Sequence, residues 1–586
     1  MIHPDAPNTA LSCLPAVQER KKPELRAGTA HSRRIVVALA ALSVMLLVAI
    51  ARRDFWYPDE PDMAEITRQM VNSGDWLRLH LYNKLFADYP PLFFWLTSAA
   101  GVIGGLSEMV LRLPTTLAAL GLLILTAVWA RRRLGEEAAF WSVLALGTTS
   151  LFVWQSVNMH VDMPFAFFIG ASLFCYDAAR TADSRRSRVG LLCGAALLMG
   201  LASLTKGPAG IVLPLAVMAA DHLAHKEYRP VVRLGCIGIG AVCIFGGWAL
   251  LYAAHAGQSN LFYFIYRQNV TRFLTGHSHL RPFYYYLVNI WADLLPWSLF
   301  IVFAIPFAWK AARRGHRPSA FVLLWFAVIF AFFTASRSKR QVYLLPLYPA
   351  ASMMIGNLLS DLIRRSSRRG PAVCRIALWP VACAFVVAGA GLIAFLPKFV
   401  EYLPESAGLA YPVAALSVTG LAGGSAMIVW LKRGRTLTAL RALPILAAAL
   451  CLVGLGWLCP ALDDPLSAKA DAHWLDRQID QERGEVAGYF RPTRKMPKES
   501  TALSFYGKFR LEVLPSAKEI LAYCARQPGD VLLLEDKDMD ALLALAVPKV
   551  TVVKRIRIGS DRFSAVRLRR RADWIPADAT DIGQTE

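Results

Sequence analysis

Acidic side chains in two separate segments have the types and spacing needed for general acid–base chemistry. The segment YPDEPDMAEI at residues 57–66 carries four carboxylates within seven positions, and Asp59 and Glu60 are the first two. A second acid, Asp162, stands in the segment NMHVDMPF between two apolar runs. Carboxylates that converge from separate loops can accept a proton or orient a nucleophile at one reacting centre. The alternative for the first segment is a solvated acidic loop.

Cationic side chains in three further segments are candidates for holding a phosphate. Lys206 lies in SLTKGP between apolar runs, and Lys339 and Arg340 lie in ASRSKRQVYLLP. Arg272 belongs to RQNVTRFLTGHSHLRPFYYYL, which is also rich in aromatic residues. Lysine and arginine donate charge-assisted hydrogen bonds to phosphate oxygens, so these residues predict an anionic ligand. For Lys206 the alternative is a side chain at a helix end that reaches toward the membrane surface.

The composition indicates that the elements positioning these residues lie in a membrane. Of the 586 residues, 55% are hydrophobic and 18% are charged, and the mean hydropathy is +0.40. The net charge of +22 would suit nucleic acid, but the positive residues form short clusters between long apolar runs, which is typical of membrane topology. We therefore expect an α-helical polytopic membrane protein that contacts membrane lipids and no nucleic acid. The ten cysteines show no ligand spacing.

Thirteen apolar runs meet or approach the length needed to cross a bilayer core of about 30 Å. If the basic tail at residues 1–34 is cytoplasmic, six basic clusters between the runs, such as Arg131–Arg133 and Lys432–Arg435, fall on the cytoplasmic side as well. Lys206 and the group Arg337, Lys339 and Arg340 fall on the opposite side, against this trend. We therefore expect a transmembrane domain at residues 35–460 and a soluble periplasmic domain at residues 461–586. The runs begin near Ile35, Leu113, Ala138, Met163, Val189, Gly207, Val231, Leu287, Ala320, Val342, Ala372, Gly408 and Leu437.

Two long loops, at residues 52–112 and 255–286, then face the same side as the C-terminal tail. The short apolar run at residues 91–106 lies in the first loop, and we interpret it as an interfacial or re-entrant helix. A short span is the alternative. In the tail, residues 531–534, 550–553 and 565–568 predict strands and residues 516–526 predict a helix, so we expect a small α/β domain.

Seven motifs follow one another in a characteristic order across some three hundred residues. They are PDEPDMAEI, ADYPPLFFWL, RLPTTLAAL, NMHVDMPFAFF, GLASLTKGPAGIVLP, TRFLTGHSHLRPFYYYL with LLPWSLF, and SRSKRQVYLLPLYPA. Together they resemble the bacterial polyprenyl-phosphate-dependent membrane glycosyltransferases, a family of the GT-C fold that includes lipid A 4-amino-4-deoxy-L-arabinose transferases and is similar to protein mannosyltransferases. About 13 transmembrane helices and a small outer α/β domain fit that family.

The resemblance implies an inverting glycosyltransferase in the bacterial inner membrane. Such an enzyme takes a sugar from an undecaprenyl-phosphate carrier and places it on lipid A or another envelope glycan or lipid at the periplasmic face. Carried over by motif, the catalytic acids are Asp59, with Glu60 beside it, and Asp162. The positions that match donor-phosphate ligands are Lys206, Lys339, Arg340 and Arg272.

One departure from the family concerns the first loop. The family often reads Glu-Lys-Pro where this chain has Asp88, Tyr89 and Pro90, so a phosphate contact is missing and we expect Lys84 to replace it. Asp88 could instead hold a divalent metal ion with His277 and His279, since histidine with carboxylate suits zinc or manganese. Exposed loop histidines are the alternative.

Two rival functions remain. A protein O-mannosyltransferase-like enzyme would use the same kind of site with a different acceptor. A secondary transporter belongs to another class, and such proteins commonly combine paired repeats with charged groups at the midplane. Here the acids and the cations gather at the outer loops instead, which favours the transferase.

Overall fold

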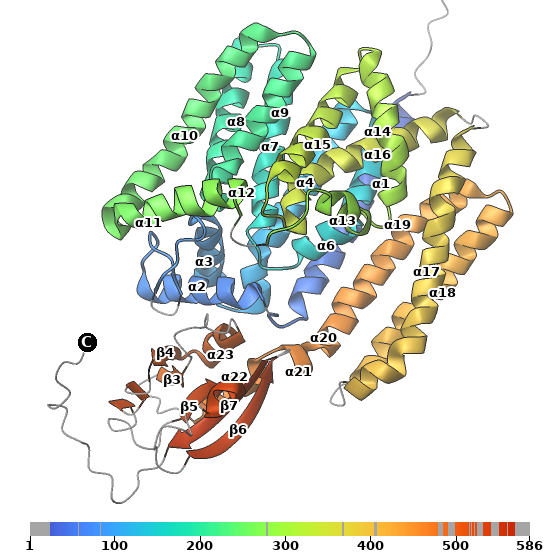
Figure 1. The fold of residues 1–586 in the computed structure, drawn as a ribbon. Helices are drawn as coiled ribbons and strands as arrows, with labels where there is room; N and C mark the ends of the chain where they lie inside the picture. The colour runs from blue at the N-terminus through green and yellow to red at the C-terminus, as the bar shows by residue number, and fades with distance from the viewer. Residues whose placement is uncertain are drawn as a thin grey trace, which may run out of the picture.

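The computed structural model shows a large helical bundle with a small sheet-containing domain at one end (Figure 1). It describes residues 24–568 apart from 57, 82–83, 277–278, 366–368, 403–406, 479–484, 490–498, 515, 517–518, 521, 524–530, 541–549 and 559–560. The first helices of the bundle are α1 (Glu24–Ala51), α4 (Glu108–Arg133), α5 (Glu136–Gly147), α6 (Ser150–Ser156), α7 (Asp162–Arg180), α8 (Arg185–Lys206), α9 (Ala209–Ala224) and α10 (Tyr228–Ala256).

A segment of short helices separates the first half of the bundle from the second half. That segment contains α11 (Gln258–Phe262), the π-helix η1 (Tyr263–Thr271), α12 (Arg272–Leu274) and α13 (Tyr285–Asp293). The later bundle helices are α14 (Ser298–Arg313), α15 (Arg317–Ala335), the 3-10 helix η2 (Gln341–Leu347), α16 (Tyr348–Arg365), α17 (Arg369–Tyr402), η3 (Ala407–Leu409), α18 (Ala410–Lys432), α19 (Thr436–Val453), η4 (Gly454–Leu458) and α20 (Cys459–Ala461).

Every one of the thirteen predicted runs has a helix at its position. Within the described residues, nine helices are long and apolar enough to cross a membrane, and counting each bent pair as one span gives up to eleven. The bent pairs are α5 with α6, at 67°, and α13 with α14, at 112°. The other two predicted runs are α7 and α9, and α9 has only 16 residues. The protein is thus a multi-span helical membrane protein, whereas the count of thirteen spans is not reached by length and composition.

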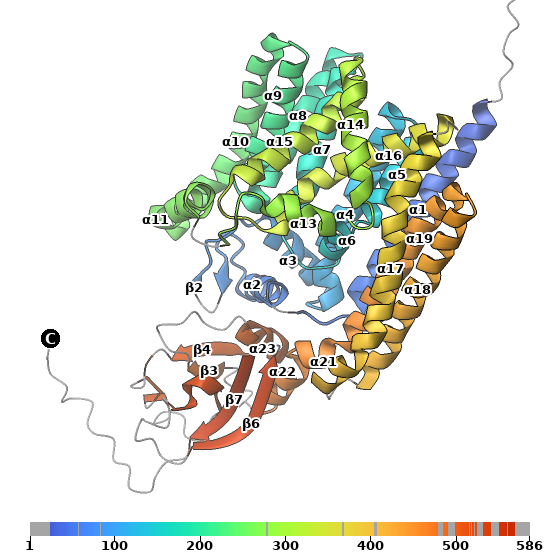
Figure 2. The ribbon, with the colours of Figure 1, turned by 45° about the vertical axis from the view of Figure 1, so that its right-hand side comes forward.

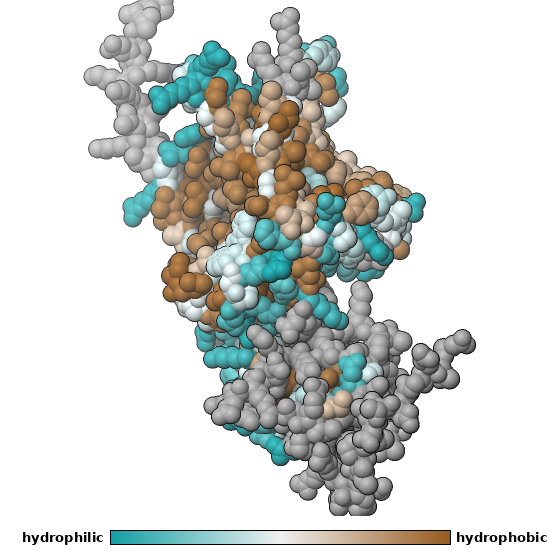
Figure 3. Space-filling model, turned by 90° about the vertical axis from the view of Figure 1, so that its left-hand side faces the viewer, coloured by the Kyte–Doolittle hydropathy of each residue, from teal (hydrophilic) through white to brown (hydrophobic). Residues whose placement is uncertain are grey.

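The surface of the bundle matches this assignment. In Figure 3 hydrophobic residues cover the middle of the bundle, and hydrophilic residues gather at both of its ends. The exposed large hydrophobic side chains include Ile103, Leu250, Val387 and Ile445. Because a soluble protein rarely exposes such a continuous apolar belt, this surface is suited to lipid.

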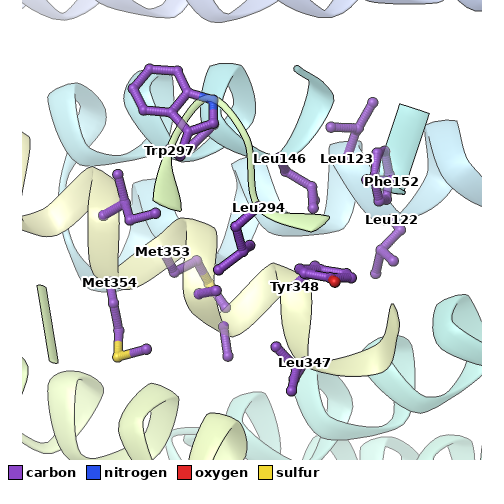
Figure 4. Packing of buried hydrophobic residues seen from close by; sticks show 14 of the residues in the cluster. Leu122, Leu123, Leu146, Phe152, Leu294, Trp297, Leu347, Tyr348, Met353 and Met354 are labelled. Carbon is purple, nitrogen blue, oxygen red and sulfur yellow. The ribbon is translucent and has the colours of Figure 1, made fainter. Parts of the chain in front are cut away.

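The bundle is held together by one buried core, part of which is shown in Figure 4. Side chains of α4, α5, α6 and α16 meet there with the turn between α13 and α14. The indole of Trp297 donates to the Thr148 hydroxyl at 2.9 Å, and that of Trp325 donates to the Pro346 carbonyl oxygen at 2.9 Å. These bonds satisfy the polar atoms of large buried side chains, as a membrane interior requires.

The first outer loop folds into α2 (Glu60–Ser73), the short strands β1 (His80–Leu81) and β2 (Lys84–Leu85), and α3 (Leu92–Gly104). Pro61 stands in the first turn of α2, where its missing N–H is not needed, and Gly74 ends the helix in the left-handed region at φ 69°. The apolar helix predicted at residues 91–106 is present as α3, which has 13 residues.

The tail is a mixed α/β domain. Its elements are α21 (Asp463–Leu466), α22 (Lys469–Asp476), β3 (Glu485–Tyr489), α23 (Glu499–Gly507), β4 (Arg510–Leu514), β5 (Val531–Glu535), β6 (Val550–Ile558) and β7 (Asp561–Leu568). The sheet order is β4-β3-β5-β7-β6, with β3 parallel to β4 and β5 and the remaining pairs antiparallel. The three predicted strands correspond to β5, β6 and β7. The predicted helix at residues 516–526 lies mostly outside the described residues.

The tail packs against the first loop, as Figure 2 shows for α23 and α2. Phe55 of the loop contacts Phe505 and Tyr506 of α23, and the Phe55 N–H donates to the Tyr506 hydroxyl at 2.7 Å. The Thr501 hydroxyl donates to Asp62 at 2.8 Å. The two segments share one hydrophobic cluster, so the tail supports the loop that carries Asp59.

Candidate functional site

The two predicted acids lie close together, joined by a histidine. Asp59 precedes the first turn of α2, and Asp162 is the first residue of α7. Between them lies His160, whose Nδ1 is 2.5 Å from Asp162 Oδ2 and whose Nε2 is 3.6 Å from Asp59 Oδ2. The segments that carry the two acids are a hundred residues apart in sequence, and the fold brings them to one centre.

Each acid also pairs with one of the predicted cations. Arg340, which precedes η2, donates to Asp59 Oδ2 at 2.7 Å. Lys206, the last residue of α8, pairs with Asp162 Oδ1. The resulting chain runs Arg340, Asp59, His160, Asp162 and Lys206, and we call it the charge relay cluster. Its charges alternate in sign, which lets five ionisable groups share a partly buried site.

The environment of Asp59 and His160 favours their charged forms. Burial alone would raise the pKa of Asp59, but His160 and Arg340 hold the pKa of this carboxyl well below its usual range. Burial alone would lower the pKa of His160, but the carboxylates of Asp162 and Asp59 raise it above its usual value. Asp59 is therefore an anion that a cation already neutralises, and it becomes an effective base only when that cation moves away.

Glu60 is adjacent to Asp59 in sequence but belongs to a different network. Its carboxylate pairs with Arg112 at 2.7 Å and with Arg53 at 3.1 Å, and it accepts the Met159 N–H at 2.9 Å. Burial alone would raise the pKa of Glu60, but the two guanidinium groups lower it to about 2. The carboxylate is fully engaged in joining α2, α4 and the His160 segment, and its predicted catalytic role stays a prediction.

An apolar cavity of about 370 Å³ opens beside the cluster. Lys206 lines it, and so do Arg272 and Tyr343. The Lys206 ammonium lies 4.4 Å from the centre of the Tyr343 ring, and Arg272 Nη2 donates to the Tyr343 hydroxyl at 2.9 Å. The remaining walls come largely from α9, η1 and α15 and are mostly hydrophobic. This is a site for a molecule with an anionic group and a long apolar part.

Two other predicted phosphate ligands are placed elsewhere. The Lys339 side chain is buried, and its ammonium donates to the Ser336 carbonyl oxygen. Its backbone N–H donates to the His279 carbonyl oxygen at 3.0 Å, which joins the loop at residues 255–286 to the segment that precedes η2. Lys84 lies exposed on β2 and is not among the described residues that line the cavity. Arg272 is thus well placed for an anionic ligand, whereas roles for Lys339 and Lys84 stay predictions.

The predicted metal ligands are partly described. Asp88 lines the cavity, and its Oδ1 accepts from Gln268 Nε2 at 2.6 Å. His279 has a positive φ of 54°, and His277 lies outside the described residues. Among the residues that the structure describes, no group of three or more His, Cys, Asp or Glu side chains could hold an ion. A bound zinc or manganese ion therefore stays a prediction.

Several important residues were not singled out from the sequence. His160 was present in the quoted motif NMHVDMPF, two positions before Asp162, and its ability to bridge two acids was the available signal. Arg53 and Arg112 are buried counterions of Glu60, and each stands at the edge of an apolar run. Nothing in their spacing predicts that partner, since Arg112 lies 52 positions from Glu60.

Known proteins resemble this chain in sequence and in fold. Residues 32–256 match the family described as dolichyl-phosphate-mannose-protein mannosyltransferase. The fold resembles that of ArnT from Cupriavidus metallidurans, solved with undecaprenyl phosphate, with a TM-score of 0.74 and 22% identity over 91% of this chain and 97% of that one. The chain has the GT-C fold. The resemblance indicated by the seven motifs is thereby confirmed.

One further solved structure and two sequence relatives also resemble this chain. Archaeal oligosaccharyltransferase AglB from Archaeoglobus fulgidus superposes with a TM-score of 0.51 and 11% identity, covering 86% of this chain and 70% of that one. Undecaprenyl phosphate-alpha-4-amino-4-deoxy-L-arabinose arabinosyl transferase 2 of Pseudomonas fluorescens is 27% identical over 329 residues, which is 56% of each chain. The corresponding transferase of Pseudomonas paraeruginosa is 28% identical over 360 residues, 59% of this chain and 64% of that one. The matched part thus spans less than two thirds of these two relatives.

Proposed function

We propose that this protein is an inverting glycosyltransferase that moves a sugar from an undecaprenyl-phosphate-linked donor to an acceptor of the cell envelope. The observation that carries the proposal is the charge relay cluster, in which Asp59 pairs with Arg340 and Asp162 pairs with Lys206, and Lys206 also lines an apolar cavity. Glycosyl transfer needs negative groups near the anomeric carbon and positive groups near a departing phosphate. The cavity supplies apolar walls for the polyprenyl chain.

The proposed reaction is a single displacement. The acceptor oxygen forms a bond to the anomeric carbon while the bond from that carbon to the phosphate oxygen breaks. The polyprenyl phosphate leaves with the bonding electron pair, and Lys206 and Arg272 stabilise its charge. If the acceptor is a hydroxyl, its proton passes to Asp59. If the acceptor is an ionised phosphate, Asp59 has only to orient it.

Donor binding would also activate the base. In the absence of donor, Arg340 neutralises Asp59 and Lys206 neutralises Asp162. An incoming phosphate competes for both cations, because phosphate oxygens accept strong charge-assisted hydrogen bonds from arginine and lysine. When Arg340 turns toward the phosphate, the pKa of Asp59 rises and the carboxylate can accept a proton. The site would therefore become basic only when a donor is present.

The relatives' names suggest the sugar and the acceptor. They describe transferases that use undecaprenyl phosphate-alpha-4-amino-4-deoxy-L-arabinose, so we propose an amino sugar donor of this kind and lipid A as the acceptor. A protein acceptor is the second candidate, and the match of residues 32–256 to the mannosyltransferase family favours it. Mass spectrometry of lipid A from a deletion strain separates the two, since a lipid A acceptor requires loss of a sugar-sized mass increment.

We further propose that the chain lies in the bacterial inner membrane with the charge relay cluster and the tail in the periplasm. The distribution of basic residues supports this orientation, because Lys310–Arg314 and Lys432–Arg435 lie at the bundle ends away from the tail. Single cysteines in a cysteine-free version test it. A cysteine at Lys508 should react with an impermeant reagent added from the periplasm, and one at Arg433 should not. The reverse pattern would overturn the orientation.

Substitution of the two acids tests the function itself. Asp59→Asn and Asp162→Asn should each reduce transfer by at least about a hundredfold, the scale on which general acid–base groups act, while the protein still inserts. Asp75→Asn is a matched control, because Asp75 lies in the same outer loop and pairs with Arg78 away from the cluster. Near-normal turnover by either acid variant in purified membranes would refute its catalytic role.

A further inference from the structure

A second and larger cavity lies between α1, α5 and α19, away from the charge relay cluster. Its volume is about 1090 Å³, slightly above the range for ligand pockets, which is about 300–1,000 Å³. The apolar part of its lining consists of Val37, Ala38, Ala41, Leu42, Phe140, Trp141, Leu144, Pro444, Ile445 and Ala448. α1 packs against both α5 and α19, and α1 and α19 lie next to each other in Figure 2.

Basic side chains line one end of this cavity. Arg33 and Arg34 lie on α1 and Arg441 lies on α19, near the ends of both helices that are away from the tail. All three side chains are exposed, and among the described residues none of the three guanidinium groups has an ion-pair partner. The one acid in the lining is Glu137, whose Oε1 accepts from the Trp141 indole at 2.8 Å. In the lining of the cavity, three arginines therefore outnumber one carboxylate.

The depth of the cavity corresponds to one leaflet of a bilayer. From Arg34 to Leu42 along α1, and from Arg441 to Ala448 along α19, the rise is about 10–12 Å at 1.5 Å per residue. Half of a hydrocarbon core of about 30 Å is about 15 Å. A molecule held at the basic end would thus have its apolar part inside the same leaflet.

We propose that this cavity binds an anionic glycerophospholipid of the leaflet opposite the C-terminal domain. The phosphate contacts Arg33, Arg34 and Arg441, and an acyl chain lies along the apolar walls of α1, α5 and α19. Basic pockets between transmembrane helices are a known way to hold anionic lipid headgroups. A zwitterionic lipid has the same chains but adds a cation, which three unpaired arginines disfavour.

The position of the cavity distinguishes this lipid from the proposed donor. The donor cavity is lined from α9, η1 and α15 and includes Lys206, whereas the second cavity is lined from α1, α5 and α19. No described residue lines both. The lipid is therefore a bound structural partner of the bundle. A hydrogen bond from Ser32 of α1 to Glu136 Oε1 of α5, at 3.0 Å, already joins two of these helices at the basic end.

Native mass spectrometry of the purified full chain tests the proposal. Phosphatidylglycerol and phosphatidylethanolamine with identical chains are titrated onto the delipidated protein. The triple variant Arg33→Gln, Arg34→Gln, Arg441→Gln should bind phosphatidylglycerol at least about tenfold more weakly than the natural chain. The control triple variant Arg132→Gln, Arg186→Gln, Arg433→Gln removes the same charge from exposed arginines outside the cavity and should change the affinity less than about twofold.

Two further measurements cover the case in which the arginine variant does not fold. Ala448→Phe keeps every charge and fills the cavity, so it should also lose phosphatidylglycerol while transfer activity remains. On the natural chain, a photoreactive phosphatidylglycerol should label peptides of α1, α5 or α19. Equal losses in the two triple variants, equal affinity for the two lipids, or labelling confined to other helices would each overturn the proposal. Recovery of polyprenyl phosphate instead of phospholipid from this cavity would overturn it as well.

Discussion

Replacing Glu60 separates a residue that positions the site from a residue that performs the reaction. The Glu60 carboxylate accepts five hydrogen bonds: two from Arg112 at 2.7 and 2.8 Å, one from Arg53 at 3.1 Å, and backbone N–H bonds from Met159 at 2.9 Å and Trp56 at 3.3 Å. The Arg112 and Arg53 side chains are 0% and 2% exposed. Glu60→Gln leaves both guanidinium groups buried without a counterion.

The size of the effect follows from this geometry. Breaking a buried ion pair by removing one partner costs about 3–5 kcal/mol. Glutamine keeps the size of the side chain and one acceptor oxygen, so the lower end, about 3 kcal/mol, is expected for Glu60→Gln. Glu60→Ala removes every acceptor and should reach the upper end. By contrast, Asp59→Asn should cost less stability than Glu60→Ala, because the Asp59 and Arg340 side chains are 24% and 26% exposed and solvent weakens their interaction.

Thermal unfolding in detergent micelles and transfer assays at low temperature measure the two effects separately. We expect Glu60→Gln to unfold at lower temperature and yet to retain transfer within about tenfold of the natural chain, well short of the loss for a general base. A double-mutant cycle with Arg112→Gln should give a coupling energy of about 1–3 kcal/mol. If Glu60→Gln has the natural unfolding temperature and no activity, the carboxylate contacts substrate and the positioning argument fails.

Three other variants probe charge elsewhere. Lys206→Ala or Arg340→Ala should raise the KM for the lipid-linked donor by at least about thirtyfold, because loss of one partner of a buried charge pair costs about 2–5 kcal/mol. An unchanged donor KM in both variants would refute the assignment of these residues to the donor phosphate. Burial and a nearby acid raise the pKa of Asp463 to about 6, so ionisation of this carboxyl destabilises the folded protein. Above pH 6, Asp463→Asn should therefore have a higher unfolding temperature than the natural chain, and near pH 4 this difference should disappear. A difference in unfolding temperature that does not change with pH would contradict the prediction. Elemental analysis should find zinc or manganese in the natural chain and none in the His277→Ala, His279→Ala double variant, and equal metal content in both would refute the metal site.

The sequence predicts the fold well because each membrane helix corresponds to one long apolar run of consecutive residues. Apolar runs and basic clusters placed a helix at every expected position, and the strands β5, β6 and β7 follow from short apolar runs in the tail. The count of spans is harder to predict, because two spans are pairs of helices with a bend between them, α5 with α6 and α13 with α14, and α9 has only 16 residues. Length alone does not reveal such a bend.

The site was predictable where the type of a residue and the motif around it indicate its chemistry. Its contact partners were not predictable from spacing. We expected the predicted acids and cations to gather at loops on one side of the membrane. The structure joins four of them in one chain of contacts: Asp59, Asp162, Lys206 and Arg340. Glu60 was paired with Asp59 because the two are neighbours. Consecutive residues at the start of a helix point in different directions, about 100° apart, so neighbours in sequence face different partners.

The cations near Asp59 and Glu60 fall into two groups that the structure separates. Arg53 and Arg112 are permanent counterions of Glu60, buried where no ligand reaches them. Arg340 and Lys206 neutralise Asp59 and Asp162 in a partly exposed chain beside a cavity. A permanent counterion stabilises the fold, whereas an accessible one can exchange its carboxylate for a phosphate. The cluster carries three cations against two carboxylates when His160 is protonated, and Arg272 lies beside it. An anionic donor is therefore attracted by net positive charge, and in the proposed mechanism it also competes with Asp59 and Asp162 for their cations, which would tie donor binding to the activation of the base.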